Sequence, residues 1–476
     1  MMKNGIYRSI IICCALCFQS LSIWAAETDP VFSKSQHIQF QESVSQHGIT
    51  WKFDGKVPVG QFVNGDYYVV GTATIVSITP KPEYGRNGSV LNLPNDPSKS
   101  GFDNRVSEGR YDPGLTVQLP VRLRPGDALI STISVKAVGE LPAPLRPQDK
   151  SISPVRVAAV LTCLDSAIPR DAFRPSYGDR KQKIFLARNL KVDSLPNLAR
   201  VTGGLDYDSR PPSPADWAEM FRRPWLDVCF FGFDAPIEYM PNYGREIGRA
   251  TGIASLLLML DFPRKEKERL LIFFVQYGID LWGLVRSGHR GWPAHGGHGS
   301  GRKWPILFSG MILGDEEMQS LGRKFPNIMF GEDMQTMKGA GWTGATALYA
   351  GHVGRDGLSG KVGWGAYEHL HPSKWVSNIG ENYRRCCTSI SWVGQALAAR
   401  IMNAEKLWAH DPFFDYVDRW MTEDDSRAIQ EIKNSRGWDY SADWSRQRQA
   451  WDPFVTSMWN AYRYKQESVK PSDLRN

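Results

Sequence analysis

The sequence predicts an α+β multidomain protein, with an N-terminal antiparallel β-sandwich-like domain followed by an (α/α) helical toroid. Two observations carry this prediction. Residues 27–163 contain several short β-rich runs with turn signals between them, which is typical of a sandwich. From residue 213 onward, apolar residues recur with helical spacing. Strands do not alternate with helices along the chain, so a parallel-sheet α/β fold is disfavoured. Residues 164–212 are predicted to be linker or wrapping loops, and residues 213–476 the toroid and catalytic domain.

The first 26 residues have the features of a secretory signal peptide. Lys3 and Arg8 give a positively charged start, residues 10–21 form a short apolar core, and the segment ends in small residues. The apolar core is short for a membrane span. We therefore expect a secreted or periplasmic protein without a membrane span after cleavage.

Four cysteines remain after this segment: Cys163, Cys229, Cys386 and Cys387. An oxidising compartment permits disulfides, but the sequence leaves their pairing open, and adjacent cysteines rarely pair with each other. These four form no Cys-x-x-Cys motif, and no comb of histidines and cysteines indicates a structural zinc site. We expect no cofactor.

The charge and the aromatic content narrow the range of partners. Without Lys3 and Arg8 the chain has 55 basic and 50 acidic residues, and both signs are mixed along it, which does not indicate a nucleic-acid partner. It has 17 Trp and 17 Tyr. Aromatic rings can stack on the apolar faces of sugars or build a large core, and the composition leaves this choice open.

The expected strands follow local signals. An Asn-Gly turn at residues 64–65 precedes a β-rich run, which predicts a hairpin. Further strands are expected at residues 74–79, 115–123, 128–135 and 155–162.

Two long helices are expected at residues 242–260 and 264–285. In the first, Gly244, Gly248 and Gly252 recur every four residues and would line one face, which permits close helix packing. Further helices are expected near residues 304–323, 388–408, 412–421 and 452–463.

The run from residue 288 to residue 305, called here the Gly-His loop, contains six glycines and three histidines. So many glycines disfavour a helix or a central strand, and histidines transfer protons near neutral pH. Arg302 and Lys303, together with the two tryptophans of the same run, could hold an anionic sugar. Its candidate substrate-binding residues are Trp292, His295, Arg302, Lys303 and Trp304.

Three further clusters carry polar side chains that could act with this loop: residues 241–246, 364–371 and 381–387. Asn242 in the first cluster could also be an ordinary helix cap. In the third, Tyr383 is followed by Arg384 and Arg385, and a neighbouring cation favours the ionised form of a tyrosine.

Several chemistries fit these residues poorly. The spacings of His295 with His298, and of His369 with His371, match no zinc motif. Ser300 lacks the outer glycines of a nucleophile elbow. A glycoside hydrolase would need two carboxylates across the scissile bond. Glu246, Asp280, Glu332, Asp333 and Glu368 are available, but none has a diagnostic setting.

Cleavage of a uronate polysaccharide by β-elimination uses the residue types that cluster here. A cation or amide neutralises the sugar carboxylate, a Tyr or His removes the C5 proton, and a Tyr or His protonates the leaving O4.

A β-rich domain followed by a helical toroid, with Asn, His, Tyr and Arg in its loops, resembles the toroid polysaccharide lyases that act on alginate, glucuronan and related polyuronates. The resemblance covers about residues 213–465 and concerns architecture and residue types. It implies that Asn242 holds the substrate carboxylate and that His298 assists neutralisation or acts as base. It also implies that Tyr383 is base, acid or both, and that Arg385 binds the carboxylate or tunes Tyr383.

The resulting expectation is a secreted lyase for an acidic polysaccharide, with Asn242, His298, Tyr383 and Arg385 as catalytic residues and no metal. The alternatives are an (α/α)-barrel glycoside hydrolase and a non-catalytic glycan-binding protein. The expected substrate-binding residues are Arg245, Trp292, His295, Arg302, Lys303, Trp304, Tyr367, His369 and Arg384.

Overall fold

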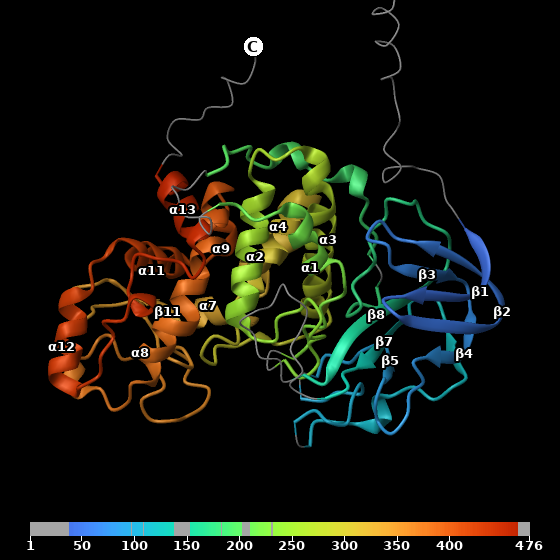
Figure 1. The fold of residues 1–476 in the computed structure, drawn as a ribbon, viewed down its shortest axis with the longest axis horizontal. Helices are drawn as coiled ribbons and strands as arrows, with labels where there is room; N and C mark the ends of the chain where they lie inside the picture. The colour runs from blue at the N-terminus through green and yellow to red at the C-terminus, as the bar shows by residue number, and fades with distance from the viewer. Residues whose placement is uncertain are drawn as a thin grey trace, which may run out of the picture.

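The computed structural model describes residues 38–137 and 153–464, apart from residues 97, 108, 182, 202–209 and 230–231. The predicted signal peptide lies outside the described residues. Figure 1 shows a curled β-sheet on one side of the molecule and a group of helices on the other. No helix among the described residues is long and apolar enough to cross a membrane.

The N-terminal strands form one eight-stranded sheet in the order β5-β7-β8-β3-β2-β4-β6, with β1 paired to β2. The antiparallel sandwich prediction is corrected here, because the described strands β1 to β8 share a single sheet and β3 pairs with β8 in parallel. The strands are β1 (Gln39–Gln46), β2 (Ile49–Gln61), β3 (Tyr67–Val70), β4 (Ala73–Thr79), β5 (Ser89–Leu91), β6 (Val121–Leu123), β7 (Ala128–Ser134) and β8 (Val155–Leu164).

The predicted strands agree with this sheet except between residues 115 and 120. The Asn64-Gly65 turn joins β2 to β3 as an antiparallel hairpin, with Gly65 at φ 87°. Residues 113–115 form a 3-10 turn instead, and only the end of the predicted run becomes β6. Pro120 follows Leu119 and cannot donate a ladder hydrogen bond, which explains the late start of the strand.

Strand β8 is buried almost along its whole length because both of its faces are covered. Val160 belongs to the core shared with the helices, whereas Leu161 and Cys163 belong to a second core inside the curl of the sheet. Ile130 and Leu129 on β7 divide in the same way. Successive side chains of a strand point to opposite faces of the sheet, which produces this division. The face that turns toward the helices shares one continuous core with them.

The C-terminal part is helical, as expected, but the contacts do not establish a closed toroid, which stays a prediction. Each long predicted helix is present, and two predicted ones are split into shorter pieces. The helices are α1 (Pro214–Phe221), α2 (Gly244–Leu258), α3 (Arg264–Arg286), α4 (Lys303–Leu313), α5 (Glu316–Gln319), α6 (Leu321–Lys324), α7 (Gly331–Met334), α8 (Ile379–Tyr383), α9 (Ser389–Ile401), α10 (Glu405–Trp408), α11 (Asp411–Thr422), α12 (Ser426–Arg436) and α13 (Pro453–Tyr462).

Glycines end or join several of these elements. Gly314, at φ 69°, ends α4 in the left-handed conformation and splits the predicted helix at residues 304–323. Two small sheets lie between the helices. They pair β9 (Gly291–Trp292) with β10 (Met329–Phe330), and β11 (Thr336–Lys338) with β12 (Ala347–Tyr349).

The predicted glycine face of α2 makes the close contacts expected of it. A Cβ at Gly252 would lie 3.0 Å from the Cα of Gly394 on α9, and one at Gly244 would lie 2.1 Å from the carbonyl oxygen of His298. Helix α2 therefore packs directly against α9 and against the Gly-His loop. This packing positions the candidate site.

Candidate functional site

Five rings from four separate segments meet beside the N-terminus of α2. We call Tyr243, His295, His298, His352 and Tyr383 the His-Tyr cluster. Tyr243 immediately precedes α2, His295 and His298 belong to the Gly-His loop, His352 follows β12, and Tyr383 ends α8. The packing of α2 against α9 and the loop brings these segments together.

His352 is the centre of the cluster. Its ring lies 5.0 Å from the ring of His295 and 4.3 Å from that of Tyr383, and its Nε2 lies 3.1 Å from Nδ1 of His295. The backbones of these two segments are also hydrogen-bonded to each other, because the carbonyl of His352 accepts from the amide of Gly296 at 2.9 Å. Two histidines from distant parts of the chain therefore form one hydrogen-bonded pair.

Tyr243 forms the opposite wall of the cluster. Its ring meets His298 edge to face at 4.7 Å, and its hydroxyl accepts a hydrogen bond from the amide of Gly297 at 3.0 Å. Burial raises the pKa of the Tyr243 hydroxyl well above its ordinary value of 10.0. At neutral pH this hydroxyl is therefore protonated.

Glycines in the loop allow the rings to approach. A Cβ at Gly296, which has φ 57°, would lie 2.3 Å from two ring carbons of Tyr383 and 3.0 Å from Cε1 of His352. A Cβ at Gly297 would lie 2.8 Å from the hydroxyl of Tyr243. Both positions need glycine for space, and Gly296 also needs it for its left-handed backbone.

Solvent reaches most of the cluster. Tyr243, His295, His298 and Tyr383 are half-buried, whereas His352 is only 3% exposed. The side of Trp364 continues the aromatic wall, at 4.4 Å from the ring of His352. The exposed Lys361 places its Nζ 4.3 Å from the centre of the Trp364 ring.

The two paired histidines are uncharged at neutral pH. Burial lowers the pKa of His352 from 6.5 to about 4, and the nearby His295, His298 and Lys361 lower it further. Burial and Lys361 also lower the pKa of His295. A neutral pair shares one proton between the facing nitrogens, so one ring donates and the other accepts.

The surroundings of His352 decide which ring donates. Its Nδ1 is buried and has no hydrogen-bond partner among the described residues. A buried N–H without an acceptor is rare, so the proton of His352 belongs on Nε2. His352 then donates to Nδ1 of His295, which places the proton of neutral His295 on its Nε2.

Two of the four predicted catalytic residues belong to the cluster, namely His298 and Tyr383. Asn242 is buried next to Tyr243, at the start of the same helix. Arg385 lies apart from it, since its guanidinium is 1% exposed and bonds Glu381 at 2.5 Å and Asp425 at 2.6 Å. Arg385 thus makes core contacts.

Arg384 and Tyr367 are also held in the core. Arg384 bonds Glu381 at 3.0 Å and the hydroxyl of Tyr416 at 2.9 Å, and the hydroxyl of Tyr367 donates to Glu381 at 2.5 Å. These two predicted substrate-binding residues contribute to a buried ion cluster, in which the neighbouring arginines lower the pKa of Glu381 to about 2 against the effect of burial.

The charged and aromatic residues of the Gly-His loop support its shape. Arg302 is buried, binds both oxygens of Asp227 at 2.9 Å and donates to the carbonyl of His298 at 2.6 Å. Lys303 is paired with Asp333. Trp292 and Trp304 are fully buried and cannot stack on a ligand at the surface. Of the five loop candidates, His295 alone lies in the cluster.

Arg245 and His369 are accessible to different degrees. Arg245 is half-buried at the edge of the cluster, where it bonds Glu246 at 2.6 Å and covers the ring of Trp451 at 4.3 Å. His369 is exposed.

The segment behind Tyr383 contains a disulfide between adjacent cysteines. Cys386 and Cys387 are bonded within a π-helical turn, Arg384–Thr388, that joins α8 to α9. The expectation that adjacent cysteines would not pair was wrong. Their carbonyls contact the site, because Cys386 accepts from Arg245 at 3.2 Å and a Cβ at Gly297 would lie 2.4 Å from the oxygen of Cys387. Cys163 and Cys229 are both buried.

The carboxylates that a glycosidase would need are engaged elsewhere. Glu246 is paired with Arg245 and Arg249, and Asp280 with Arg174. Glu332 accepts from the amide of Gly301 at 2.6 Å and from Gln395 at 2.8 Å. Asp333 pairs with Lys303, and Glu368 binds Arg419 at 2.9 Å.

Four residues of this site were not predicted from the sequence: Tyr243, His352, Trp364 and Lys361. Trp364 belongs to the predicted polar cluster at residues 364–371, and Tyr243 is next to the predicted catalytic residue Asn242. Both could therefore have been predicted from the sequence. His352 and Lys361 lie in stretches without a motif, and only the three-dimensional structure brings them to the Gly-His loop.

Among the described residues, no group of three or more His, Cys, Asp or Glu side chains is arranged to hold a metal ion. Comparisons with protein families, with curated proteins and with solved structures found no match for this chain. The site must therefore be interpreted from its own geometry.

Proposed function

We propose that the protein is a lyase that cleaves a uronate-containing polysaccharide by β-elimination at the His-Tyr cluster. The observation that supports this most is the meeting of three histidines and two tyrosines at a half-buried surface, while the candidate carboxylates are bound to other partners. Proton transfer by Tyr and His, without a carboxylate pair, is what β-elimination requires.

In the proposed reaction, a base removes the proton at C5 of the uronate. The C5–H electron pair forms a C4=C5 double bond, the C4–O4 bond breaks, and O4 leaves with a proton from an acid. Tyr383 or His298 is the base. Tyr243 is the acid, because its protonated hydroxyl belongs to the same cluster and its ring lies 4.7 Å from that of His298.

The substrate carboxylate needs a positive or hydrogen-bonding partner to make C5 acidic. Arg385, which the resemblance implied, is bound to two carboxylates in the core. We assign this task instead to Lys361 together with the Nε2–H group of His295, because both residues lie next to Trp364 and the charge of Lys361 is close enough to lower the pKa of His295. Trp364 supplies a face on which the sugar ring stacks.

The test is a spectrophotometric assay on a panel of polyuronates, in which elimination creates an unsaturated product that absorbs in the ultraviolet. Tyr383→Phe and His298→Ala are expected to lower kcat by at least about 100-fold, since positioned acid-base groups contribute roughly that much or more. Tyr464→Phe and His371→Ala are the matched controls, because both residues are exposed and lie outside the cluster.

If new reducing ends appear without ultraviolet absorbance, the protein is a hydrolase and the proposed lyase activity is wrong. Equal activity of the cluster variants and their controls would exclude the His-Tyr cluster as the reaction site. Folding of each variant is checked by its thermal unfolding, so that a lost activity is not a lost structure.

A further inference from the structure

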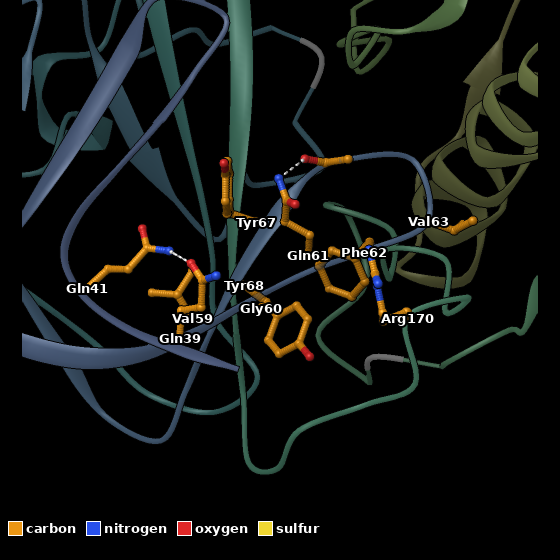
Figure 2. Close-up of a pocket in the computed structure, with 11 residues that line it drawn as sticks. Gln39, Gln41, Val59, Gly60, Gln61, Phe62, Val63, Tyr67, Tyr68 and Arg170 are labelled. Atoms are coloured by element: carbon orange, nitrogen blue, oxygen red, sulfur yellow. Dashed lines mark hydrogen bonds between the residues drawn. The ribbon is translucent and has the colours of Figure 1, made fainter. Parts of the chain in front are cut away.

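A second polar cavity lies on the β-sheet, on a part of the chain that the His-Tyr cluster does not use. It has a volume of about 590 Å³ and is lined by residues of β1, β2, β3 and the loop after β8. Small-molecule sites usually measure about 300–1,000 Å³. Figure 2 shows its side chains, with Gln41 and Gln39 on one side and Arg170 and Val63 on the other.

The strand register explains why polar groups gather here. Gln39 pairs with Val59, Gln41 with Val57, and Gln61 with Tyr67. Since alternate residues share a face, these glutamines and Tyr67 lie on the same side of three adjacent strands. Gln41 donates to the side-chain oxygen of Gln39 at 3.0 Å, and Gln61 donates to the carbonyl of Gly65 at 3.4 Å. An amide group has two donor hydrogens and two acceptor lone pairs, so these side chains can bond sugar hydroxyls as well.

Aromatic packing shapes the cavity. A Cβ at Gly60 would lie 2.3 Å from the ring of Tyr68, so glycine lets this ring lie flat against β2. Phe62 packs against the same ring at 4.9 Å. Tyr67 is half-buried and presents part of its ring to solvent. The packed rings of Phe62 and Tyr68 therefore form one wall of the cavity, and Tyr67 is the more accessible ring beside the glutamines.

The charge of the lining selects the ligand. The eleven lining residues include Arg170 and no acidic residue. Arg170 is exposed, and its guanidinium forms no ion pair or hydrogen bond with the described part of the chain. An arginine that is held by no carboxylate is available to one from a ligand.

We propose that this cavity is a second glycan-binding site, which holds a uronate-bearing segment with Arg170 on the carboxylate, the glutamines on the hydroxyls and Tyr67 against the sugar ring. The presence of a glycan site follows from the lining, whereas the uronate character of the glycan rests on the proposed function. The site would keep a long polymer attached to the enzyme between cleavages.

The experiment is isothermal titration of the full chain carrying Tyr383→Phe, with hexamers of glucuronate, mannuronate-guluronate and galacturonate, and with a neutral glucose hexamer. We expect two binding events for at least one uronate hexamer. Arg170→Ala and Gln61→Glu should each weaken one event at least tenfold and leave the other unchanged. Lys52→Ala, which removes an exposed cation elsewhere on β2, should leave both unchanged.

The absence of any event that depends on Arg170 and Gln61 would overturn the second site, whatever the activity of the enzyme. The proposed function fails separately, if no polyuronate gives an unsaturated product. A neutral hexamer that binds the cavity as tightly as the charged ones, with no effect of Arg170→Ala, would also overturn the proposal.

Discussion

At the level of single residues, Gly296 determines how closely the rings of the His-Tyr cluster can meet. Tyr383 and His352 both lie where a side chain at position 296 would be, and the left-handed backbone there further restricts the choice to glycine. Gly288, in the same loop, is also left-handed but has open space around it. Gly296 is thus required because the rings of the cluster leave no space for a side chain, whereas Gly288 is required only for its left-handed backbone.

The lowered pKa of His352 predicts how stability depends on pH. The unfolded chain takes up a proton on this residue below about pH 6.5, whereas the folded chain resists it down to about pH 4, because of burial and of the nearby His295, His298 and Lys361. Between these values the unfolded state binds more protons, so the free energy of unfolding falls as the pH falls.

His352→Gln should flatten this dependence, even though it also removes a hydrogen bond. The measurement is chemical denaturation at several pH values between 4 and 7. The slope of the free energy of unfolding against pH is compared with that of the original protein, and His371→Gln is the exposed control. An unchanged slope in His352→Gln would show that this histidine does not titrate as proposed.

The residues of the site show what the sequence could and could not predict. The Gly-His loop and Tyr383 were recognised from residue types, and they do meet. Arg384 and Arg385 follow Tyr383 directly, yet both turn into the core toward Glu381. Adjacency along a chain does not fix the direction of a side chain, and here a π-helical turn sets it.

Among the helices and strands, local sequence signals predicted most positions along the chain but not which elements pack or pair with each other. The Asn64-Gly65 hairpin was predictable because both strands lie within a few residues of the turn. The parallel pair of β3 and β8 joins Tyr67 to Leu161, across a separation over which no local pattern acts. The same limit hid His352, whose hydrogen-bonded partner is 57 residues away.

The glycine face of α2 allows a test of how helix packing supports the site. Gly252→Ala would place a Cβ 3.0 Å from backbone atoms of α9, which are not free to move aside. We expect a loss of about 1–3 kcal/mol in the free energy of unfolding. A lower activity should accompany it, because α2 follows Tyr243 and α9 follows the turn after Tyr383.

Gly248→Ala is the control on the same helix face. Its Cβ would meet neighbours at 3.6 Å or more, which is ordinary contact. Alanine favours a helix over glycine by up to about 1 kcal/mol, so this variant should be neutral or more stable. Equal effects of the two substitutions, measured by thermal and chemical unfolding, would contradict the close α2–α9 contact.

At the scale of the whole molecule, a buried ion cluster joins the sheet to the helices. Arg174, in the segment predicted as a wrapping loop, bonds Asp66 after β2 at 2.5 Å and Asp280 on α3 at 2.6 Å. All three side chains are almost fully buried. Phe173 and Tyr177 beside Arg174 belong to the core that both parts share. This segment therefore packs between the sheet and the helices.

Arg174→Met should destabilise the whole protein, because it leaves two buried carboxylates without their shared cation. Removing one partner of a buried ion pair costs about 3–5 kcal/mol. Burial already raises the pKa of Asp280 to about 6, even with Arg174 present to lower it. Without the arginine this pKa rises further, so the folded state holds a proton that the unfolded state has lost, and stability falls as the pH rises.

The expected result is therefore a loss of unfolding free energy that is larger at pH 8 than at pH 5, measured by denaturation of the full chain at both values. Arg200→Met is the matched control, since Arg200 and Asp261 are both exposed and pair at 3.0 Å. Exposed pairs contribute about 0–1 kcal/mol, and the control should show no such pH dependence. Similar small losses in both variants would mean that Asp66 and Asp280 do not depend on Arg174 and that the sheet and the helices are held together by their apolar core alone.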